Sequence, residues 1–294
     1  MAASTFRKLG GVALITGTIQ SLISLGAGSG MGRACALNFA RAGCKLVLTD
    51  VNEAGLDQTI KETRADKDKD RDVVKAVIDI KNLKVGALEE LIESIPRKFG
   101  RLDYAVNAAA ILGRFNPLGD EPLDRIEEVL AVNLTAQIAA NRAQIKAMLH
   151  PKEPLSVRLP SHPSMDKEEK DRRNAKAKTF KGSIVNFASV CGLKSFPGVV
   201  GSYTVSKHGL VGLTRALATQ YAHLGIRTNA VCPGYISTPL LWNDLPGVES
   251  QMQFIPQGRF GEVEDVADVV SFLCSEEAAY INGSALVVDG ALSI

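Results

Sequence analysis

Tyr203 and Lys207 stand four positions apart in a helix-length stretch and could together move a proton. Side chains at positions i and i+4 of a helix lie on the same face, so the two groups would share one site. An unperturbed tyrosine, with a pKa of about 10, exchanges protons poorly near neutral pH. A neighbouring ammonium group favours the phenolate and lowers that pKa toward the range useful for acid–base catalysis. A YxxxK pair alone is weak evidence, because exposed tyrosines stand near exposed lysines in many helices.

Ser189 adds a second polar group to this pattern. It directly follows the apolar run GSIVNFA (182–188), so it would occupy the carboxyl end of a buried strand. Catalytic groups of open α/β sheets collect at that edge. A hydroxyl group there can hydrogen-bond a carbonyl or alcohol oxygen without adding charge. Taken by itself, the serine would equally suit a helix cap or a loop.

These side chains need strands and helices to hold them, and short apolar runs alternate with helix-length stretches along nearly the whole chain. Strands joined through such helices form right-handed crossovers and a parallel sheet covered on both faces. We therefore predict an α/β fold with a doubly wound parallel sheet and a ligand at the carboxyl edge of its strands. The predicted strands are VALIT (12–16), KLVLT (45–49), VVKAVI (73–78), LDYAVN (102–107), GSIVNFA (182–188), IRTNAVC (226–232) and ALVVD (285–289). The helix-length stretches between them include 31–42, 85–98, 123–149, 202–223 and 262–275.

Composition narrows the class of protein. A chain of 294 residues, 46% hydrophobic and 22% charged, suits one domain over 1–294 better than two small ones. A net charge of +2 gives no field that would attract nucleic acid or an anionic membrane, so neither is an expected partner. The apolar stretch 12–27 is shorter than the ~20 residues of a membrane helix, and no secretion signal is recognisable. The five scattered cysteines lack CxxC pairs, so we expect buried thiols, no metal site and a cytoplasmic location.

The stretch GSIVNFASVCGLKSFPGVVGSYTVSKHGLVGLTRALA resembles the short-chain dehydrogenase/reductase family, and the resemblance runs from about residue 9 to the C-terminus apart from two insertions. It implies a Rossmann-like sheet of about seven strands in the order 3-2-1-4-5-6-7. It also implies that Tyr203 exchanges the proton and that Lys207 binds the nicotinamide ribose and lowers the tyrosine pKa. Ser189 would orient the substrate oxygen, and Asn133, in VLAVNLTAQ, would hold a water of a proton relay.

The same resemblance implies a site for a nicotinamide dinucleotide. The family's first turn, TGxxxGxG, lets backbone N–H groups approach the pyrophosphate at a helix N-terminus. The stretch NAVCPGYISTP resembles the turn over the nicotinamide, and AVIDI and VNAAAIL resemble the stretches beside the adenine and the ribose. The implied cofactor-binding residues are Gly17, Gly28, Ser29, Gly30, Met31, Gly32, Asp50, Asp79, Ile80, Asn107, Ala108, Ala109, Tyr203, Lys207, Pro233, Gly234, Ile236 and Thr238.

Charge at the end of the second predicted strand indicates which cofactor is used. Asp50 closes KLVLTD, where a carboxylate can accept hydrogen bonds from both ribose hydroxyls of the adenosine and would repel a 2′-phosphate. Members of the family that use NADP tend to carry arginine or lysine in the glycine loop or just after this strand, and AGSGMG and DVNEAG contain neither. We therefore predict NAD, with NADP as the alternative.

The glycine-rich start of the chain is doubled. Both VALITG (12–17) and SLISLG (21–26) end in glycine, and deleting 18–26 would leave an uninterrupted family match. Either VALIT is the first strand and 18–26 is an insertion in the phosphate loop, or SLISL takes the strand position. A third possibility is that the extra segment arises from altered splicing or a gene-model error and weakens cofactor binding. VALIT is favoured because it is richer in β-branched residues, whereas the serines of SLISL would need partners inside a sheet buried on both faces.

Two further segments depart from the regular alternation. Residues 150–181 are rich in proline and charge, so we expect a surface insertion at the amino ends of the strands. Residues 240–260 are expected to form an apolar lid over the substrate. The resemblance implies a homotetramer or homodimer built on helices 123–149 and 202–223. The leading functional prediction is hydride transfer between NAD(H) and a small-molecule secondary alcohol or ketone. The alternative is a non-catalytic relative that keeps the fold for assembly or cofactor sensing.

Overall fold

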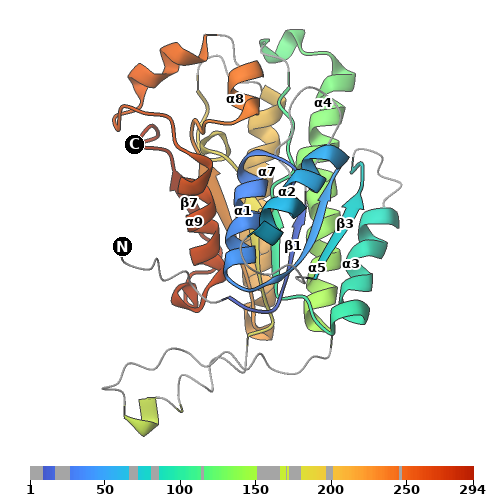
Figure 1. Ribbon diagram of the computed structural model, residues 1–294. Coiled ribbons are helices and arrows are strands. Elements are labelled where there is room, and N and C mark those ends of the chain that lie inside the picture. Colours follow the sequence, from blue (N-terminus) through green and yellow to red (C-terminus); the bar gives the residue numbers. More distant parts are fainter. Residues whose placement is uncertain are drawn as a thin grey trace.

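A computed structural model describes residues 9–16, 27–65, 72–80, 86–113, 116–150, 166–169, 171, 180–196, 201–244 and 247–294. In this part of the chain seven strands form one sheet in the order β3-β2-β1-β4-β5-β6-β7 (Figure 1). Every neighbouring pair of strands is parallel, and helices cover both faces. The predicted doubly wound α/β fold and its strand order are confirmed.

The central strands of the sheet are buried along their whole length. All residues of β1, β4, β5 and β6 are buried, as expected for strands covered on both faces. The edge strand β3 is partly exposed. The strands are β1 (Val12–Thr16), β2 (Lys45–Asp50), β3 (Val73–Val77), β4 (Tyr104–Asn107), β5 (Gly182–Phe187), β6 (Ile226–Pro233) and β7 (Ala285–Val288).

Two hydrophobic layers hold the helices on the sheet. Successive side chains of a strand point to opposite faces, so β1 directs Ala13 and Ile15 into the layer under α1 and α9. Val12 and Leu14 of the same strand enter the layer under α3, α5 and α7. The helices are α1 (Gly30–Arg41), α2 (Glu53–Ala65), α3 (Gly86–Phe99), α4 (Leu123–Leu130), α5 (Ala136–Leu149), α7 (Gly201–Tyr221), α8 (Pro239–Asp244) and α9 (Val263–Cys274).

The first strand is VALIT, which pairs with β2 on one side and with β4 on the other. Gly17 and residues 18–26 lie outside the described residues, as does most of 150–181. The predicted loop insertion and surface insertion therefore remain predictions.

Helix α2 is absent from the helix-length stretches given above. Its buried positions are Gly55, Leu56, Thr59 and Thr63, so threonines fill much of the face that packs on the protein. The threonine hydroxyls bond backbone oxygens, with Thr59 donating to Ala27 O and to Gly55 O at 2.9 Å. A buried face made largely of threonine has no apolar periodicity that a sequence pattern could reveal.

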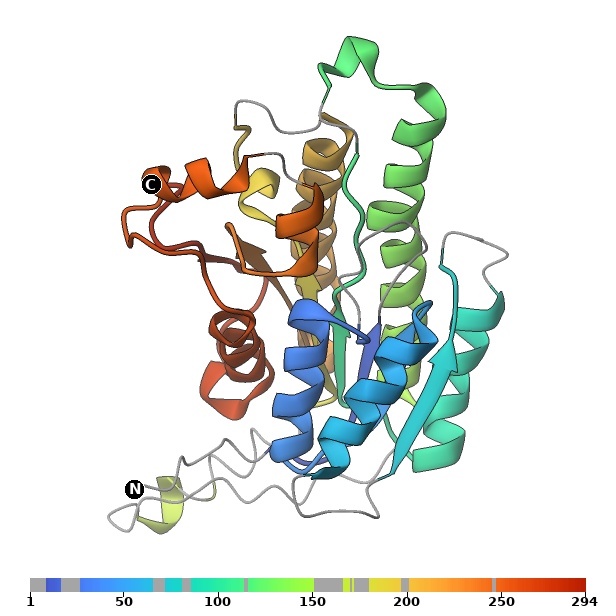
Figure 2. The same cartoon turned by 45° about the horizontal axis from the view of Figure 1, so that its top comes forward.

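The predicted helix over 123–149 is a continuous helical path with an irregular centre. Between α4 and α5 the backbone forms a π-helical turn over Ala131–Thr135. Such turns are rare and often mark functional sites. This one carries Asn133. Figure 2 shows α4 in green and α8 in orange rising on either side of the carboxyl edge of the sheet. No helix among the described residues has the length and apolar character needed to cross a bilayer.

Candidate active site

The four predicted catalytic residues are supplied by three neighbouring elements at the carboxyl edge of the sheet. Tyr203 and Lys207 occupy the first two turns of α7, and Ser189 follows the end of β5. Asn133 lies in the π-helical turn, which contacts α7. All four side chains are buried.

Lys207 lies beneath the tyrosine ring. Its Nζ is 5.4 Å from the centre of the Tyr203 ring and donates a hydrogen bond of 2.6 Å to Phe187 O, at the end of β5. Burial disfavours the ammonium form and lowers the pKa of Lys207 from 10.5 to about 8. The lysine is therefore held by the strand, next to the phenol that it is expected to assist.

The pKa of Tyr203 moves in the direction opposite to the sequence prediction. Desolvation by burial raises the pKa of this phenol well above 10.0, while a hydrogen bond with Ser189 acts to lower it. The expected lowering by Lys207 is absent in this state because burial dominates and the ammonium is directed at Phe187 O. The phenol is thus held in its protonated form.

Ser189 is both a cap and a partner of the phenol. Its Oγ accepts the N–H of Cys191 at 3.1 Å and so caps the short 3-10 turn Val190–Gly192. The same side chain lies close enough to Tyr203 to act on the pKa of its phenol. The capping bond fixes the hydroxyl oxygen beside the tyrosine, where it can also reach a substrate oxygen.

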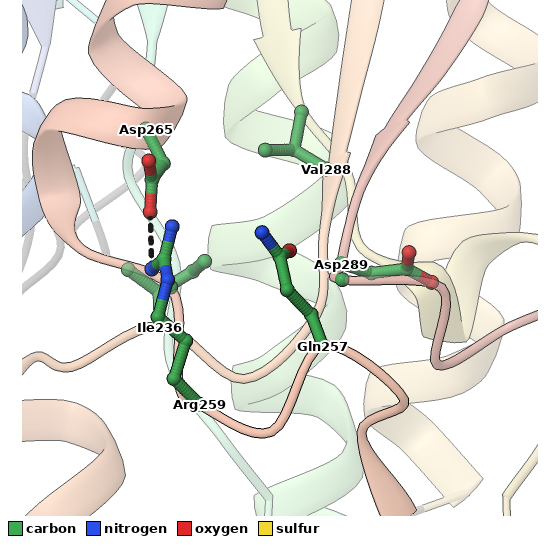
Figure 3. Close-up of a pocket in the computed structure, with 8 residues that line it drawn as sticks. Ile236, Gln257, Arg259, Asp265, Val288 and Asp289 are labelled. Carbon is green, nitrogen blue, oxygen red and sulfur yellow. Dashed lines mark hydrogen bonds and ion pairs between the residues drawn. The ribbon is translucent and has the colours of Figure 1, made fainter.

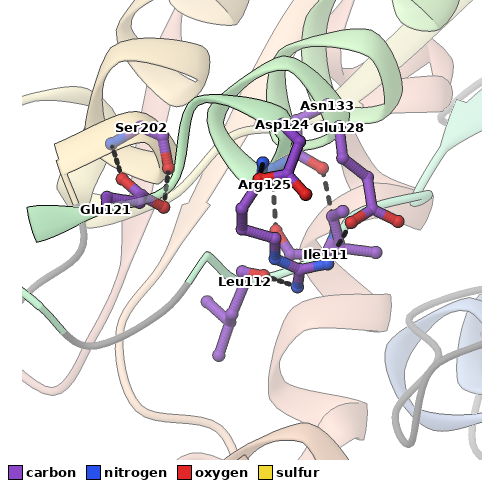
Figure 4. A network of polar contacts seen from close by, with 8 residues as sticks. All are labelled: Ile111, Leu112, Glu121, Asp124, Arg125, Glu128, Asn133 and Ser202. Carbon is purple, nitrogen blue, oxygen red and sulfur yellow. Dashed lines mark hydrogen bonds and ion pairs between the residues drawn. The ribbon is translucent and has the colours of Figure 1, made fainter.

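Asn133 joins the loop after β4 to helix α7. Its Oδ1 accepts the N–H of Ile111 at 2.8 Å, and its Nδ2 donates to Ile111 O at 2.8 Å (Figure 4). Nδ2 also donates to Ser206 Oγ at 3.2 Å, and that hydroxyl donates to Tyr203 O at 2.7 Å. Both hydrogens of the Asn133 amide therefore form hydrogen bonds within the protein, and these bonds hold the segments around Tyr203 in place.

The glycine loop and Asp50 form one unit that fits a dinucleotide. Asp50 ends β2 fully buried, and its oxygens accept the N–H groups of Gly28 at 3.0 Å and of Asn52 at 3.0 Å. A Cβ on Gly28 would lie 3.1 Å from the carboxylate, so a larger residue there would crowd it. Helix α1 begins at Gly30 without a side-chain cap from Ser29, so its N-terminus suits an anionic phosphate.

The stretch after β6 lies against β7 and the start of α9. A Cβ on Gly234 would be 2.7 Å from Asp289 Cβ, so the turn after Pro233 requires glycine. Ile236 is buried and bridges to Gly261, while Thr238 Oγ1 donates to Ile236 O at 3.3 Å. The remaining predicted cofactor residues follow strands. Met31 and Gly32 are buried in the first turn of α1, Asp79 is exposed and Ile80 buried after β3, and Asn107, Ala108 and Ala109 are buried at the end of β4.

The amide of Asn107 belongs to an interior cluster that the sequence did not reveal. Asn107 and Gln144 exchange hydrogen bonds of 3.0 and 2.7 Å, and Asn107 Nδ2 also donates to Asn186 Oδ1 at 3.0 Å. Asn186 Oδ1 accepts Asn141 Nδ2 at 3.0 Å, and Asn186 Nδ2 donates to Thr214 at 3.0 Å. This amide cluster, Asn107, Asn141, Gln144, Asn186 and Thr214, ties β4 and β5 to α5 and α7. The sequence feature that indicates such a cluster is a polar residue inside an apolar run, such as Asn186 in GSIVNFA.

A polar cavity of about 200 Å³ lies beside Ile236, on the β7 side of the sheet edge (Figure 3). Arg259 and Asp265 form an ion pair of 2.7 Å in its wall. It is lined by Ile236, Gln257, Arg259, Gly261, Asp265, Val288, Asp289 and Gly290. Among the described residues, no cluster of three or more His, Cys, Asp or Glu side chains could hold a metal ion.

Comparison with known proteins identifies the family. A family model described as enoyl-(acyl carrier protein) reductase matches residues 26–162 and 167–293. The chain belongs to the short-chain dehydrogenase/reductase family. Members of this family use NAD(P).

Two relatives of this short-chain dehydrogenase/reductase match along nearly its whole length. Levodione reductase of Leifsonia aquatica is 30% identical over 285 residues, which cover 94% of this chain and 95% of the relative. Cyclohexanol dehydrogenase of Acinetobacter sp. strain SE19 is 34% identical over 281 residues, which cover 95% and 94%. The chain is thus similar to oxidoreductases of both the reductase and the dehydrogenase kind.

Solved structures share the fold at comparable identity. The crystal structure of levodione reductase superimposes with a TM-score of 0.77 at 29% identity, over 98% of each chain. A structure from Agrobacterium tumefaciens, provisionally assigned as a 2-deoxy-d-gluconate 3-dehydrogenase, contains bound NADP. It superimposes with a TM-score of 0.73 at 29% identity over 98% of each chain.

Proposed function

We propose that this protein transfers a hydride between NAD(H) and a secondary alcohol or ketone. The observation that carries the proposal is the convergence of Ser189, Tyr203 and Lys207, with Asn133 behind them, at the same edge of the sheet as the start of helix α1. The named relatives, a levodione reductase and a cyclohexanol dehydrogenase, suggest cyclic ketones and alcohols as the first compounds to assay.

In the reducing direction the protein's own groups handle the substrate oxygen. Ser189 would donate a hydrogen bond to the carbonyl oxygen, and Tyr203, protonated in this state, would transfer its proton to that oxygen. Lys207 would stabilise the phenolate left behind, because its Nζ is already beside the ring. In the oxidising direction, Tyr203 accepts the proton of the alcohol instead.

The cofactor would be held by this chain's glycine loop and strand ends. Gly28 to Gly32 and the start of α1 would bind the pyrophosphate, Asp50 the adenosine ribose, and 233–238 the nicotinamide. When bound, the cofactor supplies or accepts the hydride.

NAD is the proposed cofactor because the family resemblance implies that Asp50 contacts the adenosine ribose, where its carboxylate would repel a 2′-phosphate. Arg33, the basic residue that follows the glycine loop, donates to Gly28 O at 2.5 Å and to Thr59 Oγ1 at 3.1 Å, which directs its guanidinium into the protein. Titration with NADH and NADPH, followed by nicotinamide fluorescence, tests this choice. Tighter binding of NADPH would contradict it. Absence of saturable binding of either cofactor would favour the non-catalytic alternative, and a variant lacking 18–26 would show whether that segment is the cause.

Tyr203→Phe tests the catalytic assignment. We expect turnover of ketones to fall by about 10²- to 10⁴-fold, the range for loss of a general acid, with NADH binding nearly unchanged. Tyr280→Phe is the matched control, because Tyr280 is fully exposed and should not affect turnover. Turnover retained in Tyr203→Phe would exclude the mechanism.

We also propose a homodimer or homotetramer in the cytoplasm. The outer surfaces of α4, α5 and α7 expose Leu123, Ile138 and Val205, which association would cover. All five cysteines are buried and none forms a disulfide, which suits a reducing compartment. Light scattering after size-exclusion chromatography tests the assembly, and a monomer would contradict it.

A further inference from the structure

Glu121 is a buried acidic residue that contacts the start of the catalytic helix. It is 6% exposed and lies between the 3-10 turn Leu118–Asp120 and helix α4. Its Oε1 accepts the Oγ–H of Ser202 at 2.7 Å, and its Oε2 accepts the N–H of Ser202 at 3.4 Å (Figure 4). Ser202 directly precedes Tyr203. The two segments that meet here are 81 residues apart in the chain.

The position of Glu121 matches a need of helix α7. The first N–H groups of a helix have no partner within the helix, and an acceptor there stabilises the first turn. An acidic group at a helix N-terminus also interacts favourably with the helix dipole. Burying an acidic group costs free energy unless the group is hydrogen-bonded, so the bonds from Ser202 stabilise Glu121 in its buried position. Glu121 thus supplies, from a distant segment, a side-chain acceptor for the N–H of Ser202 in the first turn of the helix.

The charged side chains of Arg125 and Glu128, which follow Glu121 in helix α4, have partners other than Glu121. Arg125, one turn into α4, pairs with Glu128 and donates to Leu112 O. Among the ion pairs of the described residues, none includes Glu121. Within the described residues, both hydrogen bonds that the Glu121 carboxylate accepts come from Ser202.

Close packing surrounds the same contact. A Cβ on Gly201, the first residue of α7, would lie 3.1 Å from Leu118 Cδ1, so the 3-10 turn is pressed against the start of the helix. On the other side, Arg125 and Asn133 hold the loop at Ile111 and Leu112, and Leu112 packs against the small apolar cluster that contains Tyr203. Small movements of the turn would therefore be passed to the tyrosine.

We propose that Glu121 is a positioning residue for the reaction: it caps helix α7 from another part of the chain and thereby holds Tyr203 at the substrate oxygen. The inference rests on the proposed function of Tyr203, but the cap itself is a structural contact that can be measured without turnover. Glu121 does not touch substrate or cofactor, so its loss should act on the catalytic step and not on cofactor binding.

The experiment compares Glu121→Ala, Glu121→Gln and Ser202→Ala with Asp120→Ala, an exposed acidic neighbour, as control. Hydrogen exchange is measured on peptides covering 201–207, and kcat and the KM for NADH are measured on the same preparations. For Glu121→Ala we expect amide exchange in the first turn of α7 about tenfold faster, as loss of a cap implies. We expect kcat lower by about 10- to 100-fold, since small displacements of catalytic groups cost this much, with an unchanged KM for NADH.

Glu121→Gln should recover most of both properties, because its amide oxygen can still accept the Ser202 hydroxyl. Ser202→Ala should fall between wild type and Glu121→Ala, because it keeps the backbone N–H. If Glu121→Ala does not fold, the Gln and Ser202→Ala variants still decide. Unchanged exchange and kcat in Glu121→Ala, or equal losses in the Ala and Gln variants, would overturn the proposal. If wild type has no turnover at all, the proposed function fails, whereas the exchange data still report on the cap.

Discussion

The two sides of the site differ in the kind of side chain that they bury and the kind that they expose. The wall that carries the proposed catalytic residues, formed by β4, β5, α5 and α7, buries polar side chains and pairs them with one another, as in the reciprocal bonds of Asn107 and Gln144. The predicted lid, 240–260, leaves large apolar side chains exposed, among them Trp242 at 45% and Phe254 at 60%. Exposed apolar groups beside a site are groups that a ligand or a partner would cover.

The difference shows which part of the site is complete without a ligand. Ser189 and Asn133 are already held by hydrogen bonds within the protein, and Tyr203 is buried beside them, so these preorganised polar groups need no rearrangement during the reaction. In the lid, Trp242 is fixed from one side only, by its edge-on contact with Phe260 and its N–H bond to Ser237 Oγ at 3.1 Å. We infer that the wall determines the chemistry and the lid the choice of substrate.

The largest effect on turnover is expected from removing the buried ammonium group of Lys207. Lys207→Met should lower turnover by about 10²- to 10⁴-fold, because the phenolate of Tyr203 would lose its stabilising ammonium. Lys194→Met, which changes an exposed lysine, is the control and should leave turnover near that of wild type. Turnover of Lys207→Met equal to the control would show that the lysine only packs.

The same variant predicts a change in how stability depends on pH. Burial lowers the pKa of Lys207 from 10.5 to about 8, so between these values the unfolded chain binds a proton that the folded chain does not. The free energy of unfolding contributed by this group therefore rises with pH across this window and is constant below about pH 8. The difference in the free energy of unfolding between wild type and Lys207→Met, measured by denaturant unfolding, should therefore rise with pH over this range, whereas the difference between wild type and Lys194→Met should not.

A smaller effect is expected from breaking the amide cluster. Gln144→Met should lower the free energy of unfolding by about 1–3 kcal/mol, because the Asn107 amide would lose both bonds to Gln144 inside the protein. Gln137→Met is a matched control on the same helix. Gln137 Oε1 has no partner among the described residues, so the substitution removes only the Nε2 bond to Ala109 O. Urea denaturation measures both, and a loss at Gln137 as large as that at Gln144 would contradict the role given to the cluster.

The smallest effect on stability is expected in the lid. Phe254→Ala should change the free energy of unfolding by no more than about 0.5 kcal/mol, as for most surface positions, since the ring is largely exposed. It should instead raise the KM for bulky ketones and leave that for small ones nearly unchanged. A panel of ketones of increasing size, assayed with wild type and variant, measures this. An equal rise in KM for all ketones of the panel would show that Phe254 supports the site as a whole and does not select substrates by size.

Local pattern was sufficient for most of the fold and for the grouping of the catalytic residues. Apolar runs set the strands, and the composition of VALIT favoured it over SLISL as β1. The i, i+4 spacing of Tyr203 and Lys207 and the position of Ser189 after an apolar run were enough to place three groups at one edge. These properties depend on residues near one another in the chain, which is why they could be read from it.

Tertiary structure alone decided the environment of those residues. The raised pKa of Tyr203 comes from burial by several elements, and the pairing of Asn107 with Gln144 joins β4 to α5. Helix α2 buries threonines because the loop oxygen of Ala27 is there to accept a bond. The contact of Glu121 with Ser202 spans 81 residues. The sequence determines which groups are present and along which element they lie, but burial and long-range hydrogen bonds set their protonation and position, and these arise only when distant segments pack together.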